Sequence, residues 1–171
     1  MIDNSKLKFT WLQREILEFL FRNPLTEFNG RELAKRLKVS PTAILKAIKL
    51  LVKIDYVVLE KNIRLSIKLN RENEKVLQLK RVYNLESLYM SGITDDLYNN
   101  YPGCIIVLFG SYSFGEDIEK SDIDIAIIGS KGKDSSLNKF ENILQRNINM
   151  QFYNDFKDIP KNLLENLING I

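Results

Sequence analysis

Two aspartates separated by one residue, Asp122 and Asp124, are the strongest candidates for chemistry in this sequence. They lie in an apolar run that predicts a strand, and residues two apart on a strand project from the same face. Two carboxylates held this close repel each other unless a cation lies between them. Mg²⁺ or Mn²⁺ prefers such oxygen ligands and is commonly held by carboxylates together with substrate phosphates. The pair therefore predicts a divalent metal site.

A glycine and a serine, Gly110 and Ser111, directly follow another predicted strand, the apolar run 104–109. Glycine lets the backbone approach a ligand closely, and the serine hydroxyl can bind a phosphate oxygen together with nearby N–H groups. Ser121 could bind a phosphate as well, or cap the strand that follows it. Phosphate-binding groups beside paired metal ligands are the two parts of a phosphoryl-transfer site.

The segment GSYSFGEDIEKSDIDIAI resembles the signature of the DNA polymerase β-like nucleotidyltransferase superfamily, in which Gly-Ser is followed by ten residues and then Asp-x-Asp. It looks most like the minimal nucleotidyltransferases of archaea and bacteria. The resemblance implies that Gly110 and Ser111 contact the triphosphate of ATP or another NTP, and that Asp122 and Asp124 bind one or two Mg²⁺ ions. It also implies transfer of a nucleoside monophosphate to an acceptor, and some members are antitoxins that adenylylate a partner toxin.

The expected third strand, Ile148 to Tyr153, departs from the family pattern. In the family a third carboxylate on a neighbouring strand helps to bind metal and to activate the attacking hydroxyl, whereas the polar face here shows Asn149 and Gln151. An amide brings no charge and accepts no proton at neutral pH, and loss of a general base typically costs about 10²–10⁴-fold in rate. A second hypothesis therefore stays open, a DNA-binding regulator whose degenerate transferase domain senses a nucleotide without turnover. Three other acids could substitute, although the sequence does not place them: Glu116, Asp155 and Asp158.

The sequence contains no histidine and one cysteine, Cys104. Ser-His-Asp and Cys-His nucleophilic centres and ordinary zinc sites are therefore excluded, so chemistry must rely on carboxylates. No apolar run approaches the about 20 residues that span a bilayer, and the N-terminus lacks the pattern of a signal peptide. These features predict a cytoplasmic protein without membrane contact.

The N-terminal half predicts a different kind of site. Apolar residues recur at helical spacing from Phe9 to Phe21, and two shorter helices follow, the second with Ser40 as N-cap and Pro41 at its first position. Two β-rich runs, 56–59 and 63–69, have the pattern of a hairpin. Helix, helix, turn, helix and hairpin is the order of a winged helix-turn-helix.

Charge supports two modules with different partners. Residues 1–70 contain 14 Lys/Arg and 7 Asp/Glu, whereas residues 71–171 contain 11 and 15. In a helix-turn-helix the second helix of the pair enters the major groove and reads bases near its N-terminus. The outward residues of that helix and of the wing are the predicted contacts to double-stranded DNA: Ser40, Thr42, Lys46, Lys49, Lys61 and Arg64. A dimerisation or protein-partner role stays open, because this helix offers no Arg, Asn or Gln for bidentate base contacts.

The sequence thus predicts an α+β protein in three parts. A winged helix-turn-helix domain spans 1–70, a connecting helical region spans 71–100, and a minimal nucleotidyltransferase domain with a mixed sheet spans 101–171. The connecting region is long enough to help pair two chains as a homodimer. Its expected apolar positions are Val76, Leu79, Val82, Tyr83, Leu85 and Leu88.

Overall fold

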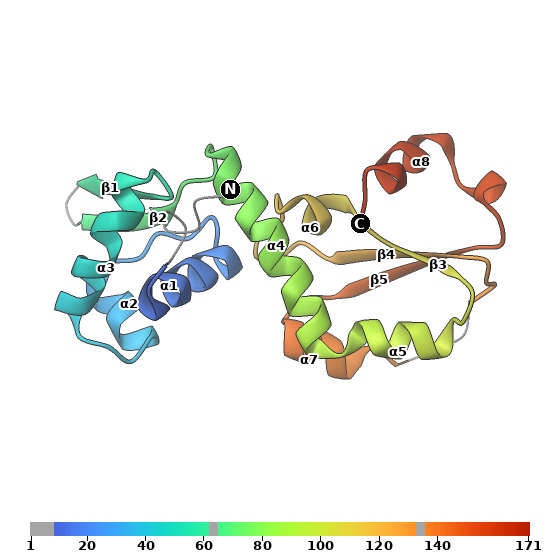
Figure 1. The fold of residues 1–171 in the computed structure, drawn as a ribbon, viewed down its shortest axis with the longest axis horizontal. Coiled ribbons are helices and arrows are strands. Elements are labelled where there is room, and N and C mark those ends of the chain that lie inside the picture. The colour runs from blue at the N-terminus through green and yellow to red at the C-terminus, as the bar shows by residue number, and fades with distance from the viewer. Residues whose placement is uncertain (1–8, 62–64, 133–135) are drawn as a thin grey trace, which may run out of the picture. The chain divides into compact units, whose positions relative to one another are not determined.

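The computed structural model of the chain describes residues 9–61, 65–132 and 136–171. The chain divides between Val76 and Leu77 into two compact units, and the elements of each are labelled in Figure 1. Each unit has its own buried core. Among the helices of the described ranges, none combines the length and the apolar character needed to cross a bilayer.

The first unit is a helix-turn-helix followed by a hairpin. Its elements are α1 (Trp11–Arg22), α2 (Gly30–Arg36), α3 (Pro41–Lys53), β1 (Val57–Lys61) and β2 (Leu65–Leu69). The expected start of α3 is confirmed, because the Ser40 side chain accepts a hydrogen bond from the Ala43 backbone N–H at 3.2 Å and Pro41 is the first helical residue. β1 and β2 pair antiparallel, and the hairpin turn lies outside the described residues. A core shared by the three helices and β2 holds the unit together: Ile16, Leu20, Leu33, Ile44, Ile48, Leu51 and Ile67.

The second unit is built around a three-stranded mixed sheet in the order β3-β4-β5. Its elements are α4 (Glu74–Ser91, beginning just before the division), α5 (Ile93–Asn100), β3 (Ile105–Phe109), α6 (Gly110–Phe114), β4 (Ile123–Ile128), α7 (Asn138–Leu144), β5 (Ile148–Tyr153), a 3-10 turn (Phe156–Asp158) and α8 (Lys161–Ile168). β3 pairs antiparallel with β4, which pairs parallel with β5. The mixed sheet expected from the sequence is therefore confirmed.

The two faces of this sheet bury different clusters. One face packs against α4, α5 and α7 through residues such as Leu88, Ile93, Ile123, Ile125 and Phe140. The other packs against α8 through Phe109, Ala126, Ile128, Ile159 and Leu167. Figure 1 shows α8 on one side of the strands and α5 and α7 on the other. Alternate residues of β4 therefore point to different helices. This alternation fixes the direction of Asp124, in the strand, and of Asp122, directly before it.

The structure differs from the sequence-based expectation in two places. The segment after β3 begins with the short helix α6, which the sequence pattern does not indicate. On α4 the expected apolar positions Val76 and Leu88 are buried, but Val82 is 63% exposed, and Lys80 and Asn84 are buried instead. Buried positions recur every four residues, at Val76, Lys80, Asn84 and Leu88, so two polar side chains occupy the face that packs inward.

Candidate nucleotide and metal site

The two aspartates lie on the α8 face of the sheet, at the start of β4. Asp122 directly precedes the strand and Asp124 is its second residue. Their neighbours Ile123 and Ile125 are buried in the cluster on the opposite face. Because side chains alternate along a strand, this burial directs both carboxylates away from that core. Asp122 is exposed and Asp124 half-buried, so both carboxylates can reach solvent and a ligand.

The Gly-Ser pair lies directly beside Asp124. Phe109, the last residue of β3, pairs in register with Asp124, so the chain leaves the strand at Gly110 next to that carboxylate. Gly110 has φ +73°, and an added Cβ would lie 2.7 Å from the Asp124 Oδ2. Glycine is required here both by the left-handed backbone and by the room that the carboxylate oxygen occupies. Ser111 follows in the first turn of α6 and is partly buried.

Asn149 occupies the position beside Asp124 on the third strand. The two residues pair in register, and the Asn149 Nδ2 donates a hydrogen bond to the Asp124 Oδ1 at 3.0 Å. Asn147, just before β5, donates in the same way to the Asp122 Oδ1 at 3.2 Å. Gln151 pairs with Ala126 instead, and its side-chain oxygen accepts a hydrogen bond from the Tyr153 hydroxyl at 2.7 Å. Of the two amides, Asn149 is therefore the one in contact with a carboxylate.

These side chains fit a magnesium ion whose ligands come partly from the protein and partly from a substrate. Mg²⁺ is usually bound by one or two carboxylates together with phosphates and water, and Asp122 and Asp124 supply two carboxylates. The described residues contain no group of three His, Cys, Asp or Glu side chains placed to hold a metal. Neither Glu116, Asp155 nor Asp158 therefore completes such a group. Asp122, Asp124 and the amide of Asn149 are the side chains that such an ion would meet here.

A polar hollow of about 310 Å³ adjoins Asp122. Its lining carries both signs of charge: Glu119, Lys120, Ser121, Asp122, Glu141, Asn142, Gln145, Arg146 and Asn147. The Ser121 hydroxyl accepts a hydrogen bond from the Ile118 backbone N–H at 3.0 Å and so closes the turn before Asp122. Contact between Ser121 and a phosphate stays a prediction.

Four residues that support the site were not identified from the sequence: Lys80, Asn84, Asp117 and Arg146. Asp117 lies in the turn between α6 and β4 and is 2% exposed, and Lys80 of α4 is 1% exposed. The Lys80 ammonium donates to the Asp117 carboxylate and, at 2.6 Å, to the Asp117 backbone carbonyl. The sequence places Lys80 and Asn84 at four-residue intervals from Val76 and Leu88, on one helical face, but this spacing does not identify Asp117 as their partner.

The predicted DNA contacts of α3 lie on its exposed side. Thr42, Lys46 and Lys49 are exposed, whereas the Ser40 hydroxyl serves as the helix cap. The side chain of Lys61 and all of Arg64 lie outside the described residues. In the wing, the hydrogen bond that the Lys68 ammonium donates to the Glu60 carboxylate raises the pKa of Lys68.

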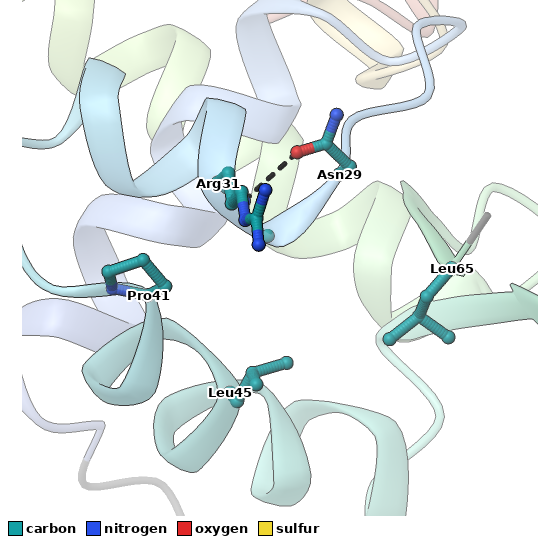
Figure 2. A pocket seen from close by; sticks show the side chains of 6 residues that line it. Asn29, Arg31, Pro41, Leu45 and Leu65 are labelled. Carbon is teal, nitrogen blue, oxygen red and sulfur yellow. Dashed lines mark hydrogen bonds between the residues drawn. The ribbon is translucent and has the colours of Figure 1, made fainter.

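A hollow of about 630 Å³ opens beside the start of α3. Figure 2 shows Pro41 and Leu45 of α3 on one side of it, with Leu65 of β2 opposite and Arg31 at the start of α2. Leu45 is 45% exposed. The side of α3 that carries Pro41 and Leu45, beside the exposed Lys46, is thus apolar and open to solvent.

Fold and site together define a helix-turn-helix unit joined to a small α/β unit with a two-aspartate site. Comparison with protein families agrees. Residues 12–62 match the family described as HTH domain, and residues 94–170 match the family described as polymerase beta, nucleotidyltransferase. The chain therefore combines a helix-turn-helix domain with a nucleotidyltransferase domain of the polymerase β family.

Similar solved structures include proteins of two bacteria. A mutant of ZitR from Lactococcus lactis is 21% identical, with 56% of this chain and 64% of that chain covered and a TM-score of 0.42. A second ZitR mutant, in complex with DNA, is also 21% identical. The match covers 57% of this chain and 65% of that chain, with a TM-score of 0.42. The adhesin competence repressor AdcR from Streptococcus pyogenes is 24% identical, with 58% and 73% covered and a TM-score of 0.39.

The chain spans slightly less than two thirds of the length of ZitR. At these TM-scores the likeness carries no functional argument. Among curated proteins, no relative matches the chain.

Proposed function

We propose that the second unit binds an NTP together with Mg²⁺, with ATP as the first candidate, and transfers its nucleoside monophosphate to an acceptor hydroxyl. The observation that carries this proposal is the register of β3 and β4. It puts the Gly110–Ser111 turn, suited to phosphate, beside the carboxylate of Asp124. Asp122, on the same face, supplies the second acid.

In this reaction the acceptor oxygen bonds to the α-phosphorus, the bond to pyrophosphate breaks, and the acceptor loses its proton. Bound Mg²⁺ would neutralise charge that develops on the phosphates. Asp122 and Asp124 hold the ion, while the backbone and hydroxyl of Ser111 orient the triphosphate. Asn149 cannot accept the proton, so the proton passes to water and the transfer is slow.

Asp124→Asn tests the transfer. The substitution keeps the shape of the side chain and the oxygen that accepts from Asn149, but it removes one of two metal-binding charges. Pyrophosphate release from labelled NTPs with Mg²⁺ is expected to fall at least about 10²-fold, the order of effect of losing a charged catalytic group. Asp95→Asn, an exposed change of the same kind in α5, serves as the control and should release pyrophosphate at the wild-type rate. If Asp124→Asn released pyrophosphate as fast as wild type, the carboxylate of Asp124 would have no part in the transfer.

One observation favours a second function for the same site, nucleotide sensing without turnover. Asn149 stands where the family has a third carboxylate, and its side-chain N–H donates a hydrogen bond to Asp124. In this case the second unit binds the Mg²⁺–NTP complex and releases no pyrophosphate. The whole protein is then a regulator that acts on DNA through the first unit. Nucleotide binding without pyrophosphate release, in the presence of candidate acceptors, would select this alternative.

For the first unit we propose binding to double-stranded DNA through α3. The exposed residues Thr42, Lys46 and Lys49 lie on a helix-turn-helix domain with an excess of basic residues. Lysines that contact phosphates release counterions, and each contact makes the slope of log K against log salt more negative by about 0.9.

Replacing both Lys46 and Lys49 with alanine should weaken DNA binding and make this slope less negative by about 2, because two phosphate contacts are lost. Fluorescence anisotropy with a labelled duplex at several salt concentrations measures both quantities. The double change Lys157→Ala with Lys161→Ala alters the net charge equally at exposed sites in the second unit. If this control weakens binding as much as the α3 variant does, the effect is one of net charge and α3 is not the contact.

A further inference from the structure

The turn that joins Gly110 to Asp124 is fastened to α4 by buried polar side chains. We propose that Lys80 and Asn84 are positioning residues, which hold this turn in the conformation that binds the nucleotide. The proposal rests on the nucleotide binding proposed above and goes beyond the Gly-Ser and Asp-x-Asp residues. Neither residue touches the ligand, and both act through Asp117 and the backbone of the turn.

Asp117 is the point at which the turn is held. Its side chain is 1% exposed, as is that of Lys80, which donates both to its carboxylate and to its carbonyl oxygen, the latter at 2.6 Å. One buried ammonium therefore fixes side chain and backbone of the same residue. A carbonyl inside a turn lacks the regular partner that a strand or helix provides, so a buried donor from α4 sets where this part of the backbone lies.

Asn84 links two points of the turn, Tyr112 and Asp117. Its Nδ2 donates to the Tyr112 carbonyl at 2.9 Å and to the Asp117 Oδ1 at 2.8 Å. Tyr112 lies in α6, directly after the predicted phosphate-binding pair, while Asp117 lies five residues before Asp122. A single amide of α4 thus fixes the distance between the two halves of the turn.

Arg146, just after α7, holds the turn at the next residues. Its Nη1 donates to the Glu119 carbonyl at 2.7 Å, and its Nη2 lies 3.8 Å from the Asp117 Oδ2. The backbone of the turn is therefore contacted at residues 112, 117 and 119 by side chains from two other segments. Two cations face one buried carboxylate.

Stability alone does not account for such a cluster. Apolar side chains of similar volume commonly stabilise a fold as well as a buried ion pair does, because both ions must be stripped of water. A network of directional hydrogen bonds instead favours one geometry. A binding site needs its groups held within about 0.5 Å, and the buried network supplies this restraint directly behind the turn.

The test uses the full chain with Lys80→Met and Asp117→Asn together, which removes the bonds of Lys80 and leaves neither partner of this ion pair charged, while Arg146 keeps its hydrogen bond to the Glu119 carbonyl. Hydrogen exchange of residues 111–121 is measured without nucleotide, and the affinity for Mg²⁺–ATP by calorimetry. We expect faster exchange confined to this segment and an affinity at least about tenfold weaker, the equivalent of about 1.4 kcal/mol. The matched control is Lys139→Met with Asp96→Asn, the same pair of changes at an exposed ion pair of 3.6 Å, and both of its readouts should equal those of wild type.

Asn84→Leu is the second variant, because it removes both donated bonds while the Lys80–Asp117 pair stays intact. It should raise exchange at Tyr112 to Asp117 and weaken Mg²⁺–ATP binding in the same direction. Wild-type exchange and affinity in either folded variant would overturn the positioning role. Absence of Mg²⁺–ATP binding by the wild-type chain would instead overturn the proposed function, while the exchange measurement would still report whether Lys80 holds the turn.

Discussion

Asn149→Asp is expected to raise the affinity of the site for divalent metal and to increase nucleotidyl transfer by about 10²–10⁴-fold, the usual contribution of a general base. Asn149 pairs in register with Asp124 and already contacts its carboxylate at 3.0 Å. The substitution changes a neutral donor into a third acid at the same position. Without metal, three neighbouring carboxylates repel, so the variant should also unfold at a lower temperature in EDTA than in Mg²⁺.

Calorimetric titration with Mn²⁺, thermal unfolding with and without Mg²⁺, and pyrophosphate release measure these effects. Gln151→Glu provides the matched control, because it introduces the same charge two residues along the strand, opposite Ala126 and beside Tyr153. This control should bind Mn²⁺ as wild type does. If Asn149→Asp also leaves Mn²⁺ affinity unchanged, the carboxylates of Asp122 and Asp124 do not form a metal site.

Gly115→Ala is expected to destabilise the second unit by about 2–5 kcal/mol. Gly115 has φ +75°, and an added Cβ would lie 2.3 Å from the Leu77 carbonyl oxygen and 2.8 Å from the Arg81 nitrogen. The left-handed backbone costs an alanine about 1–2 kcal/mol, and forcing extra volume into packed backbone costs about 1–3 kcal/mol more. Because the obstacle is the backbone of α4, no side chain can rotate to relieve it.

Gly103→Ala separates these two causes. Gly103 has a similar φ of +78°, but nothing lies within 4 Å of the position of an added Cβ. Its replacement should therefore cost only the backbone term of about 1–2 kcal/mol. Chemical denaturation of both variants measures the difference, and equal losses would mean that the turn does not pack against α4 as closely as described.

The elements that carry the site could be predicted because their signals are local. Ser40 followed by Pro41 defines the start of α3, and the alternation of Asp122, Ile123, Asp124 and Ile125 defines a strand with one polar and one apolar face. Sequence spacing does not determine strand register. The pairing of Asp124 with Phe109 and Asn149 therefore needed the structure, and it distinguishes Asn149 from Gln151 as the residue beside the carboxylate.

The buried polar cluster could not be predicted because charged residues in a helix are usually exposed. Lys80 and Asn84 interrupt an apolar face, and only Asp117, more than thirty residues away along the chain, explains why they are buried. The same partnership places two polar side chains between the buried residues Val76 and Leu88, and Val82, expected on that face, is exposed. Pairing of two chains through α4 stays a prediction.

The most direct test of the central proposal is calorimetric titration of ATP into the full chain, once with Mg²⁺ and once with EDTA. Paired carboxylates repel a bare triphosphate and bind it only through a shared cation, so the account predicts saturable binding with Mg²⁺ and at least about tenfold weaker binding with EDTA. The same titration with the other NTPs determines which base is preferred. If no NTP binds in the presence of Mg²⁺, or if binding is equally strong in EDTA, the turn from Gly110 to Asp124 is not a metal-dependent nucleotide site.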